Sequence, residues 1–230
     1  VDEVLQRQPD YVRELLLQTA VLDRLSAPLC DALTGLEGGR EMLESLERDN
    51  LFVVSLDDKR HWFRYHHLFA DVLRARALAE QPHQVPVLHQ RASAWYERHG
   101  LPSDAVRHAL AAEDFGRAAD LLEQTGRAML TTKQDAFLDW LKALPDEVIR
   151  ARPVLGVYYA VALLPGDLAA AEARLRDAEG LLDRASARPD AAAVEMVVVE
   201  DEGFRSLPAS MAIVRAYLAG ASGDVPETVH

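Results

Sequence analysis

The hydrophobic pattern of the first 50 residues predicts three short helices. Residues 11–18 place Val12, Leu15 and Leu16 on one face, which is the spacing of an amphipathic helix. A second helix is expected from Pro28 to Leu33, because proline is tolerated in the first turn, and Thr34-Gly35 ends it. A third helix, residues 40–49, follows the glycine pair at 38–39.

The next thirty residues predict a hairpin and a fourth helix. Residues 51–56 form an apolar strand, the charged residues 57–60 form a turn, and residues 61–65 alternate between aromatic and polar side chains. An amphipathic helix from about His67 to Ala79 continues directly from the second strand. Helices, then a hairpin, then a helix is the element order of a winged-helix domain, which we expect over about residues 10–80.

Residues 81–86 contain two prolines and predict a domain boundary. Beyond it the pattern predicts paired helices at 87–99, 103–112, 115–125, 136–144, 154–164, 167–185 and 204–218. The short breaks at 113–114, 166–167 and 223–224 are too far apart for the ~34-residue period of a regular tetratricopeptide array. We therefore predict a mainly α-helical protein with three parts: a winged-helix domain (1–80), a helical arm (81–150) and irregular tetratricopeptide-like hairpins (151–230). Residues 186–203 fit a loop, a helix end or a strand equally well.

Composition narrows the class of protein. With 49% hydrophobic and 27% charged residues, the chain fits a soluble globular protein, and no apolar run approaches the ~18 residues of a membrane span. A single cysteine, Cys30, excludes an internal disulfide and favours a cytoplasmic location. Because Cys30 lies in an apolar helical stretch, we expect a buried side chain rather than a nucleophile.

The net charge of −12 argues against DNA binding by this chain, because neutralising phosphate supplies most of the affinity for DNA. The third predicted helix, which would enter the major groove in a DNA-binding winged helix, carries two arginines against four carboxylates. The winged helix is therefore better suited to packing against protein.

The amino-acid sequence of the predicted wing is specific enough to suggest a protein family. The run LERDNLFVVSLDD (46–58), followed by FRYHHLFADVLRAR (63–76), resembles the large bacterial ATP-dependent LuxR-type transcription regulators of the MalT-like kind. Residues 19–35, 88–97, 105–110, 143–145 and 166–172 resemble successive parts of the same family, collinear over roughly residues 10–185.

That resemblance implies an arrangement of domains. Such regulators are similar in having a P-loop NTPase, a winged helix, a helical sensor and a C-terminal helix-turn-helix, so both ends of this chain look cut. The chain has no GxxxxGK[ST] motif, and ATP or ADP is expected only in the full-length protein. The implied partners are the protein's own NTPase domain, an unidentified small-molecule or protein inducer on the helical region, and further copies in the active state.

His66, at the predicted strand-to-helix junction, resembles the family's histidine that contacts nucleotide phosphate from the winged-helix side. An imidazole can donate to a phosphate oxygen, and a helix N-terminus favours an anion. The alternative is a structural histidine that caps the helix or fills the wing. His67 replaces the proline that is frequent at this position in the family.

Other candidate sites are weaker. His61, His66 and His67 lack a further ligand at metal-binding spacing, so no metal site is predicted. The wing aromatics Trp62, Phe63, Tyr65 and Phe69 are expected to pack in the wing and core. The sequence shows no catalytic constellation, which indicates a regulatory protein rather than an enzyme. A plain helical scaffold for protein partners and a one-component winged-helix DNA binder remain alternatives.

Overall fold

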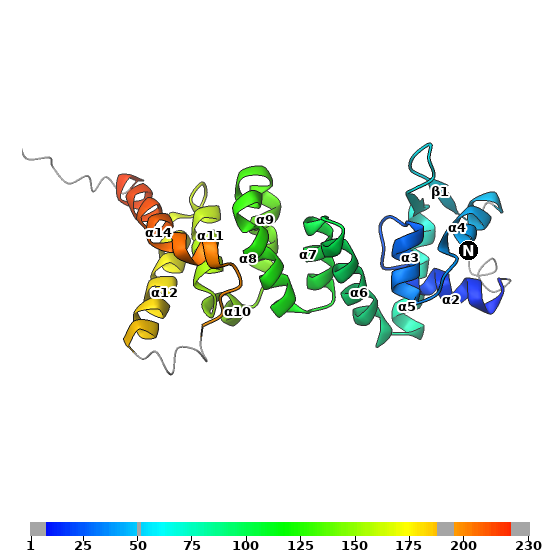
Figure 1. Cartoon of the computed structure of the whole chain (residues 1–230), viewed down its shortest axis with the longest axis horizontal. Coiled ribbons are helices and arrows are strands. Elements are labelled where there is room, and N and C mark those ends of the chain that lie inside the picture. The colour runs from blue at the N-terminus through cyan, green and yellow to red at the C-terminus, as the bar shows by residue number, and fades with distance from the viewer. Residues whose placement is uncertain (1–7, 50–51, 188–195, 222–230) are drawn as a thin grey trace, which may run out of the picture. The chain divides into compact units, whose positions relative to one another are not determined.

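The computed structural model describes residues 8–49, 52–187 and 196–221, and the chain divides into two compact units at Glu113 and Asp114 (Figure 1). The described residues contain twelve helices and one two-stranded antiparallel sheet. The expected class, a mainly α-helical protein with a small wing, is confirmed. None of the described helices is both long and apolar enough to cross a membrane.

Three helices open the first unit: α2 (Asp10–Thr19), α3 (Ala27–Thr34) and α4 (Gly39–Arg48). The turn after α3 uses Gly35 at a φ of 73°, a left-handed conformation that glycine adopts without strain. The backbone N–H of Gly39 then donates to Asp31 Oδ1 at 2.8 Å. A Cβ at residue 39 would lie 2.7 Å from that oxygen, so only glycine allows α4 to begin this close to α3.

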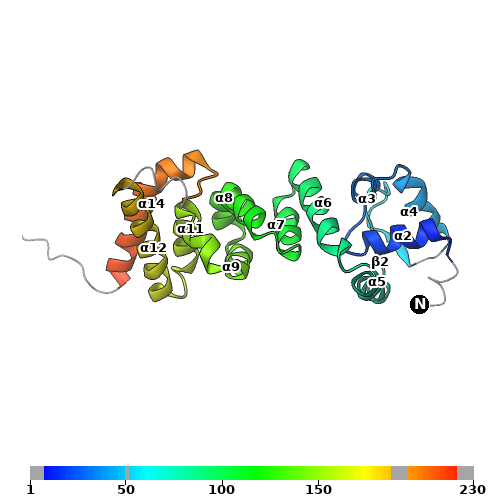
Figure 2. The same ribbon diagram turned by 90° about the horizontal axis from the view of Figure 1, so that it is seen from below.

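The wing consists of β1 (Val53–Ser55) and β2 (Phe63–Tyr65), with Val53 opposite Tyr65 (Figure 2). Both strands are shorter than predicted, and Leu51 lies outside the described residues. Phe63 and Tyr65 are buried whereas Arg64 is exposed, as the alternating pattern requires. Phe63 also exchanges two backbone hydrogen bonds with Leu25, of 2.7 and 2.8 Å, which attaches β2 to the loop between α2 and α3.

Helix α5 (His67–Glu80) follows β2 directly, and the hairpin of α6 (Gln84–Arg98) and α7 (Pro102–Ala111) completes the first unit. Both hairpin helices begin earlier than predicted. Pro86 falls in the first turn of α6 and Pro102 in that of α7, where a missing N–H costs nothing. The prolines of residues 81–86 therefore do not keep the whole segment out of a helix.

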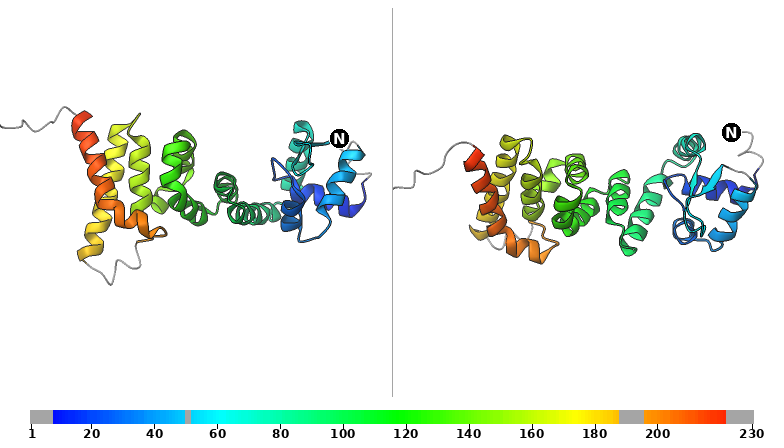
Figure 3. Two further views of the ribbon diagram at one scale, coloured as in Figure 1. Left: turned by 45° about the horizontal axis from the view of Figure 1, so that its top comes forward. Right: turned by 90° about the horizontal axis from the view of Figure 1, so that it is seen from above.

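The second unit contains α8 (Phe115–Thr132), α9 (Gln134–Ala143), α10 (Asp146–Arg150), α11 (Pro153–Leu163), α12 (Leu168–Ala187) and α14 (Asp201–Ala221). Helix α11 is buried along almost its whole length, because it packs against α8, α9, α12 and α14 (Figure 3). Its nearly unbroken apolar sequence is typical of a helix with neighbours on every side.

Helix α8 runs past its predicted end at Thr125 to Thr132, and α10 was not predicted at all. The reason for the first error is Gly126: a Cβ there would lie 2.5 Å from the Tyr158 ring, so this glycine serves close packing and does not end the helix. The ambiguous stretch 186–203 proves composite. Residues 186–187 end α12, 188–195 lie outside the described residues, 196–200 belong to no helix or strand, and 201–203 begin α14.

Candidate functional site

His66 occupies the position just before the first residue of α5. Its backbone N–H donates to Phe52 O at 2.7 Å, and its C=O accepts the first hydrogen bonds of the helix. The imidazole makes no side-chain cap, is exposed, and lies 4.4 Å from the ring of His67. The ring is therefore neither a helix cap nor a filling of the wing, and it faces solvent at a helix N-terminus.

The wing aromatics pack as predicted. Phe63, Tyr65 and Phe69 are at most 5% exposed, and the Tyr65 hydroxyl shares a 2.7 Å hydrogen bond with Thr19 Oγ1. Trp62 lies beneath the Arg24 guanidinium, 4.4 Å from the ring centroid. These aromatic rings hold the wing against α2 and the α2–α3 loop, and they fix where α5 begins.

Two further sequence candidates have structural explanations. Cys30 is fully buried, and burial, with a smaller effect of Asp31, raises the pKa of its thiol to about 12, so the thiolate that reacts as a nucleophile is not formed near neutral pH. On α4, Arg40 pairs with Glu44, and Glu47 pairs with Arg60. The first pair engages one of the two arginines of α4, so less positive charge on this helix is available to phosphate.

The histidines 61, 66 and 67 form no metal site: among residues 8–49, 52–187 and 196–221, no three His, Cys, Asp or Glu side chains are grouped for a metal ion.

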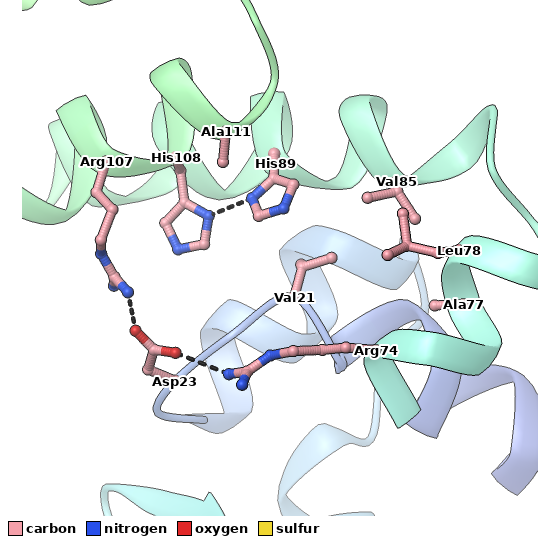
Figure 4. Close-up of a pocket in the computed structure, with 10 residues that line it drawn as sticks. All are labelled: Val21, Asp23, Arg74, Ala77, Leu78, Val85, His89, Arg107, His108 and Ala111. Carbon is pink, nitrogen blue, oxygen red and sulfur yellow. Dashed lines mark hydrogen bonds and ion pairs between the residues drawn. The ribbon is translucent and has the colours of Figure 1, made fainter. Parts of the chain in front are cut away.

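A pocket of about 370 Å³ in the first unit was not anticipated from the sequence (Figure 4). Helix α5, the α2–α3 loop and the α6–α7 hairpin line it. Its lining includes a pair of histidines, with His89 Nδ1 and His108 Nδ1 2.8 Å apart. Its lining is Val21, Asp23, Arg74, Ala77, Leu78, Val85, His89, Arg107, His108 and Ala111.

Charged groups occupy one side of this pocket. The Asp23 carboxylate accepts from Arg74 at 2.8 Å and also pairs with Arg107, so it joins α5 to α7 (Figure 4). Burial, with smaller effects of His89 and Arg107, lowers the pKa of His108 to about 3. Burial and then Arg74 lower the pKa of His89 in the same way. Both imidazoles are therefore neutral at pH 7.

Sequence reasoning could not find this pair. Each histidine lies on a predicted amphipathic helix without a motif around it, and only the packing of α6 on α7 brings the two rings together. The one available signal was a polar residue, His108, between the apolar positions Val106 and Ala109 on the buried face of α7.

Among the described residues of the second unit, two charged side chains are buried: Glu123 on α8 and Arg152 before α11, which are 0% and 7% exposed. Glu123 Oε1 accepts the backbone N–H groups of Val199 at 2.8 Å and Glu200 at 3.2 Å. Arg152 pairs with Asp120 at 2.7 Å. These contacts hold the segment before α14 against α8, so we interpret Glu123 and Arg152 as structural residues.

Comparison with known proteins agrees with the geometry. Residues 1–85 match the family model of the MalT winged helix domain. The chain is 35% identical over 228 residues to the HTH-type transcriptional regulator MalT of Yersinia pestis (strain Pestoides F), covering 99% of this chain and 24% of that protein. It is 35% identical over 214 residues to MalT of Yersinia enterocolitica, covering 93% and 23%. The serine/threonine-protein kinase PknK of Mycobacterium tuberculosis (strain H37Rv) is 39% identical over 166 residues, covering 71% and 15%.

The fold thus defines a class, a winged-helix domain that continues into packed α-helical hairpins and whose wing is built on a buried aromatic cluster. Within that class the chain belongs to the MalT-like transcriptional regulators, and the resemblance inferred from the wing sequence is confirmed. The chain spans about a quarter of the length of these MalT relatives.

Proposed function

We propose that this chain is the regulatory part of an ATP-dependent MalT-like transcription regulator. In this proposal the winged helix packs on the protein's own NTPase domain and favours the ADP-bound resting state. The helical region receives an inducer, a small molecule or a protein, and binding shifts the population towards an ATP-bound, self-associating state. The observation that carries the proposal is the exposed His66 imidazole at the start of α5.

The chemistry of this position suits a nucleotide phosphate. The N–H groups in the first turn of an α-helix have no intrahelical acceptors, and the helix dipole adds a partial positive charge there. An imidazole beside them supplies a further donor to a phosphate oxygen. Since the His66 ring makes no side-chain cap, it is available for such a contact.

The surface around His66 also suits a protein partner. Phe52, Val54, Leu56 and Leu68 are 38%, 42%, 48% and 61% exposed, although each carries a large apolar side chain. These side chains come from the wing hairpin and the first turn of α5, the two segments that flank His66, and exposed apolar side chains can mark an interaction site. The occupant we propose is the NTPase domain, which would bring its bound nucleotide to the N-terminus of α5.

The test is His66→Ala in a full-length MalT-like protein that carries this chain, with His67→Ala as the matched control. A charge-assisted hydrogen bond contributes roughly 1.5–3 kcal/mol. Its loss should weaken ADP binding about tenfold or more and raise transcription without inducer. His67→Ala should change both much less. The melting temperature of each variant separates this effect from a loss of stability at the start of α5.

If His66→Ala folds normally and retains wild-type ADP affinity and basal transcription, His66 has no nucleotide role. A gel shift tests the alternative of a one-component DNA binder. Micromolar or tighter binding of duplex DNA by this chain at about 150 mM salt would favour that alternative, because even basic proteins bind non-specifically with a Kd of only ~10⁻⁴ to 10⁻⁶ M.

A further inference from the structure

The pocket around His89 and His108 has a defined arrangement of protons. His108 is 2% exposed, and its Nε2 atom is buried without a hydrogen-bond partner. A buried N–H group without an acceptor is rare in proteins, so the proton of neutral His108 belongs on Nδ1. That proton is donated to His89 Nδ1, 2.8 Å away.

The tautomer of His89 follows from that of His108. Since His89 Nδ1 accepts, the proton of neutral His89 must be on Nε2. In Figure 4 the side of the His89 ring away from His108 faces the space between Val21 and Val85. The pocket therefore contains an imidazole N–H donor, from His89, beside the apolar side chains of Val21, Leu78 and Val85.

The charges in the lining sum to one positive charge, from Arg74 and Arg107 against Asp23. Outside the lining, Asp71 pairs with Arg74 at 3.5 Å and Asp104 pairs with Arg107 at 2.9 Å. The two guanidinium groups in the lining can pair with one carboxylate, whereas the three aspartates nearby oppose a ligand with several negative charges.

We propose that this pocket binds a small monocarboxylic acid with an aliphatic or aromatic body. The carboxylate accepts from His89 Nε2–H and lies beside the Arg74 or Arg107 guanidinium. The body packs against Val21, Leu78 and Val85. A volume of about 370 Å³ is at the low end of the ~300–1,000 Å³ found for small-molecule pockets. A phosphate ester, with nearly two negative charges, fits the surrounding aspartates less well.

Such a ligand would contact both parts of the first unit. Asp23, Arg74 and Leu78 come from the α2–α3 loop and α5, whereas His89 and Arg107 come from the α6–α7 hairpin. Binding would stabilise the packing of the hairpin against the winged helix. This inference is independent of the nucleotide role proposed for His66.

The test uses the 230-residue chain with isotope-labelled histidine, titrated with hexanoate or benzoate and, for comparison, hexylamine and inorganic phosphate. Both carboxylates should cause saturable NMR shifts of the His89 and His108 ring protons at millimolar concentration. At saturation the pKa of His89 should rise by about one unit, because an anion within 4–6 Å favours the protonated ring. Hexylamine and phosphate should bind at least tenfold more weakly.

Three variants test the pocket, and the third is the matched control. His89→Phe removes the donor, and we expect at least a tenfold loss of affinity. Ala111→Phe fills the pocket from an exposed position and keeps both histidines, so it should abolish binding, whereas Ala75→Phe at an exposed position on α5 outside the pocket should not. The proposal is overturned if neither carboxylate gives saturable shifts by about 10 mM, or if Ala111→Phe binds them as well as the unmodified chain does.

Discussion

Replacing Glu123 by leucine should release the segment before α14 from the second unit. Glu123 is fully buried, and one of its oxygens accepts the N–H groups of Val199 and Glu200. Leucine fills a similar volume but accepts no hydrogen bond. The variant therefore removes both acceptor contacts while it largely preserves the packing of α8.

The magnitude follows from the geometry. Hydrogen bonds to a charged acceptor contribute about 1.5–3 kcal/mol each, so two of them set an upper bound of roughly 3–6 kcal/mol. Two effects reduce this. The released amides can bind water, and burial disfavours the carboxylate, as its raised pKa shows. We expect a loss of about 2–3 kcal/mol in the free energy that keeps the segment closed, which is a change of about 30- to 150-fold.

Amide hydrogen exchange measured by NMR is the appropriate assay. In Glu123→Leu the amides of Val199 and Glu200 should exchange about 30- to 150-fold faster, while amides of α4, in the other unit, stay unchanged. Glu123→Gln keeps a carbonyl acceptor and should accelerate exchange less than tenfold. Unchanged exchange in Glu123→Leu would refute the argument. Glu123 Oε2 also lies 3.6 Å from Arg152 Nη1. An equal effect of both variants would show that this charge pairing, and not acceptance from the backbone, holds the segment.

Two further predictions concern α8 and the wing. Gly126→Ala should lower the free energy of unfolding, measured by urea denaturation, by about 1–3 kcal/mol, because the added Cβ would overlap the Tyr158 ring. Gly116→Ala is the control: an added Cβ there has nothing within 4 Å, so this variant should raise the free energy of unfolding by about 0.5–1 kcal/mol. Equal effects of the two variants would contradict the packing role of Gly126. Hydrogen bonds from the backbone of His61, and then of Trp62, lower the pKa of Asp57, so its contribution to the wing turn is complete above about pH 4 and is lost as the pH falls through the lowered folded value. An NMR titration should show the Trp62 amide shifting in that acidic range, and the shift should be absent in Asp57→Asn.

Local pattern was sufficient to predict the wing. The alternation of residues 61–65 gives the buried face of β2 directly, because successive strand side chains point to opposite sides. Cys30 was predicted to be buried from its apolar neighbours alone, and it is. The buried face of a strand depends on residues close in sequence. The burial of an apolar side chain such as Cys30 does not depend on which particular residues cover it.

Features that depend on tertiary packing were not accessible. The helix predicted at 115–125 was too short, and the sequence does not reveal that an aromatic ring from α11 lies against Gly126 in its continuation. The histidine pair was missed because its two members lie on different helices, and no motif links them. The acceptor role of Glu123 depends on a segment more than seventy residues away.

The loop between α2 and α3 connects three parts of the first unit through consecutive residues. Asp23 pairs with Arg74 of α5 and Arg107 of α7, Arg24 covers Trp62, and Leu25 is bonded to Phe63 of β2. A change in the position of this loop would alter the geometry of the pocket and of the start of α5 together. Suppose that a partner bound at His66 shifts the loop and thereby changes the affinity of the pocket for its ligand. Thermodynamic reciprocity then requires that the pocket ligand change the affinity of His66 for that partner by the same factor. An insertion of flexible residues between Asp23 and Leu25 should weaken that mutual influence, because it separates the residue that lines the pocket from the residue bonded to β2.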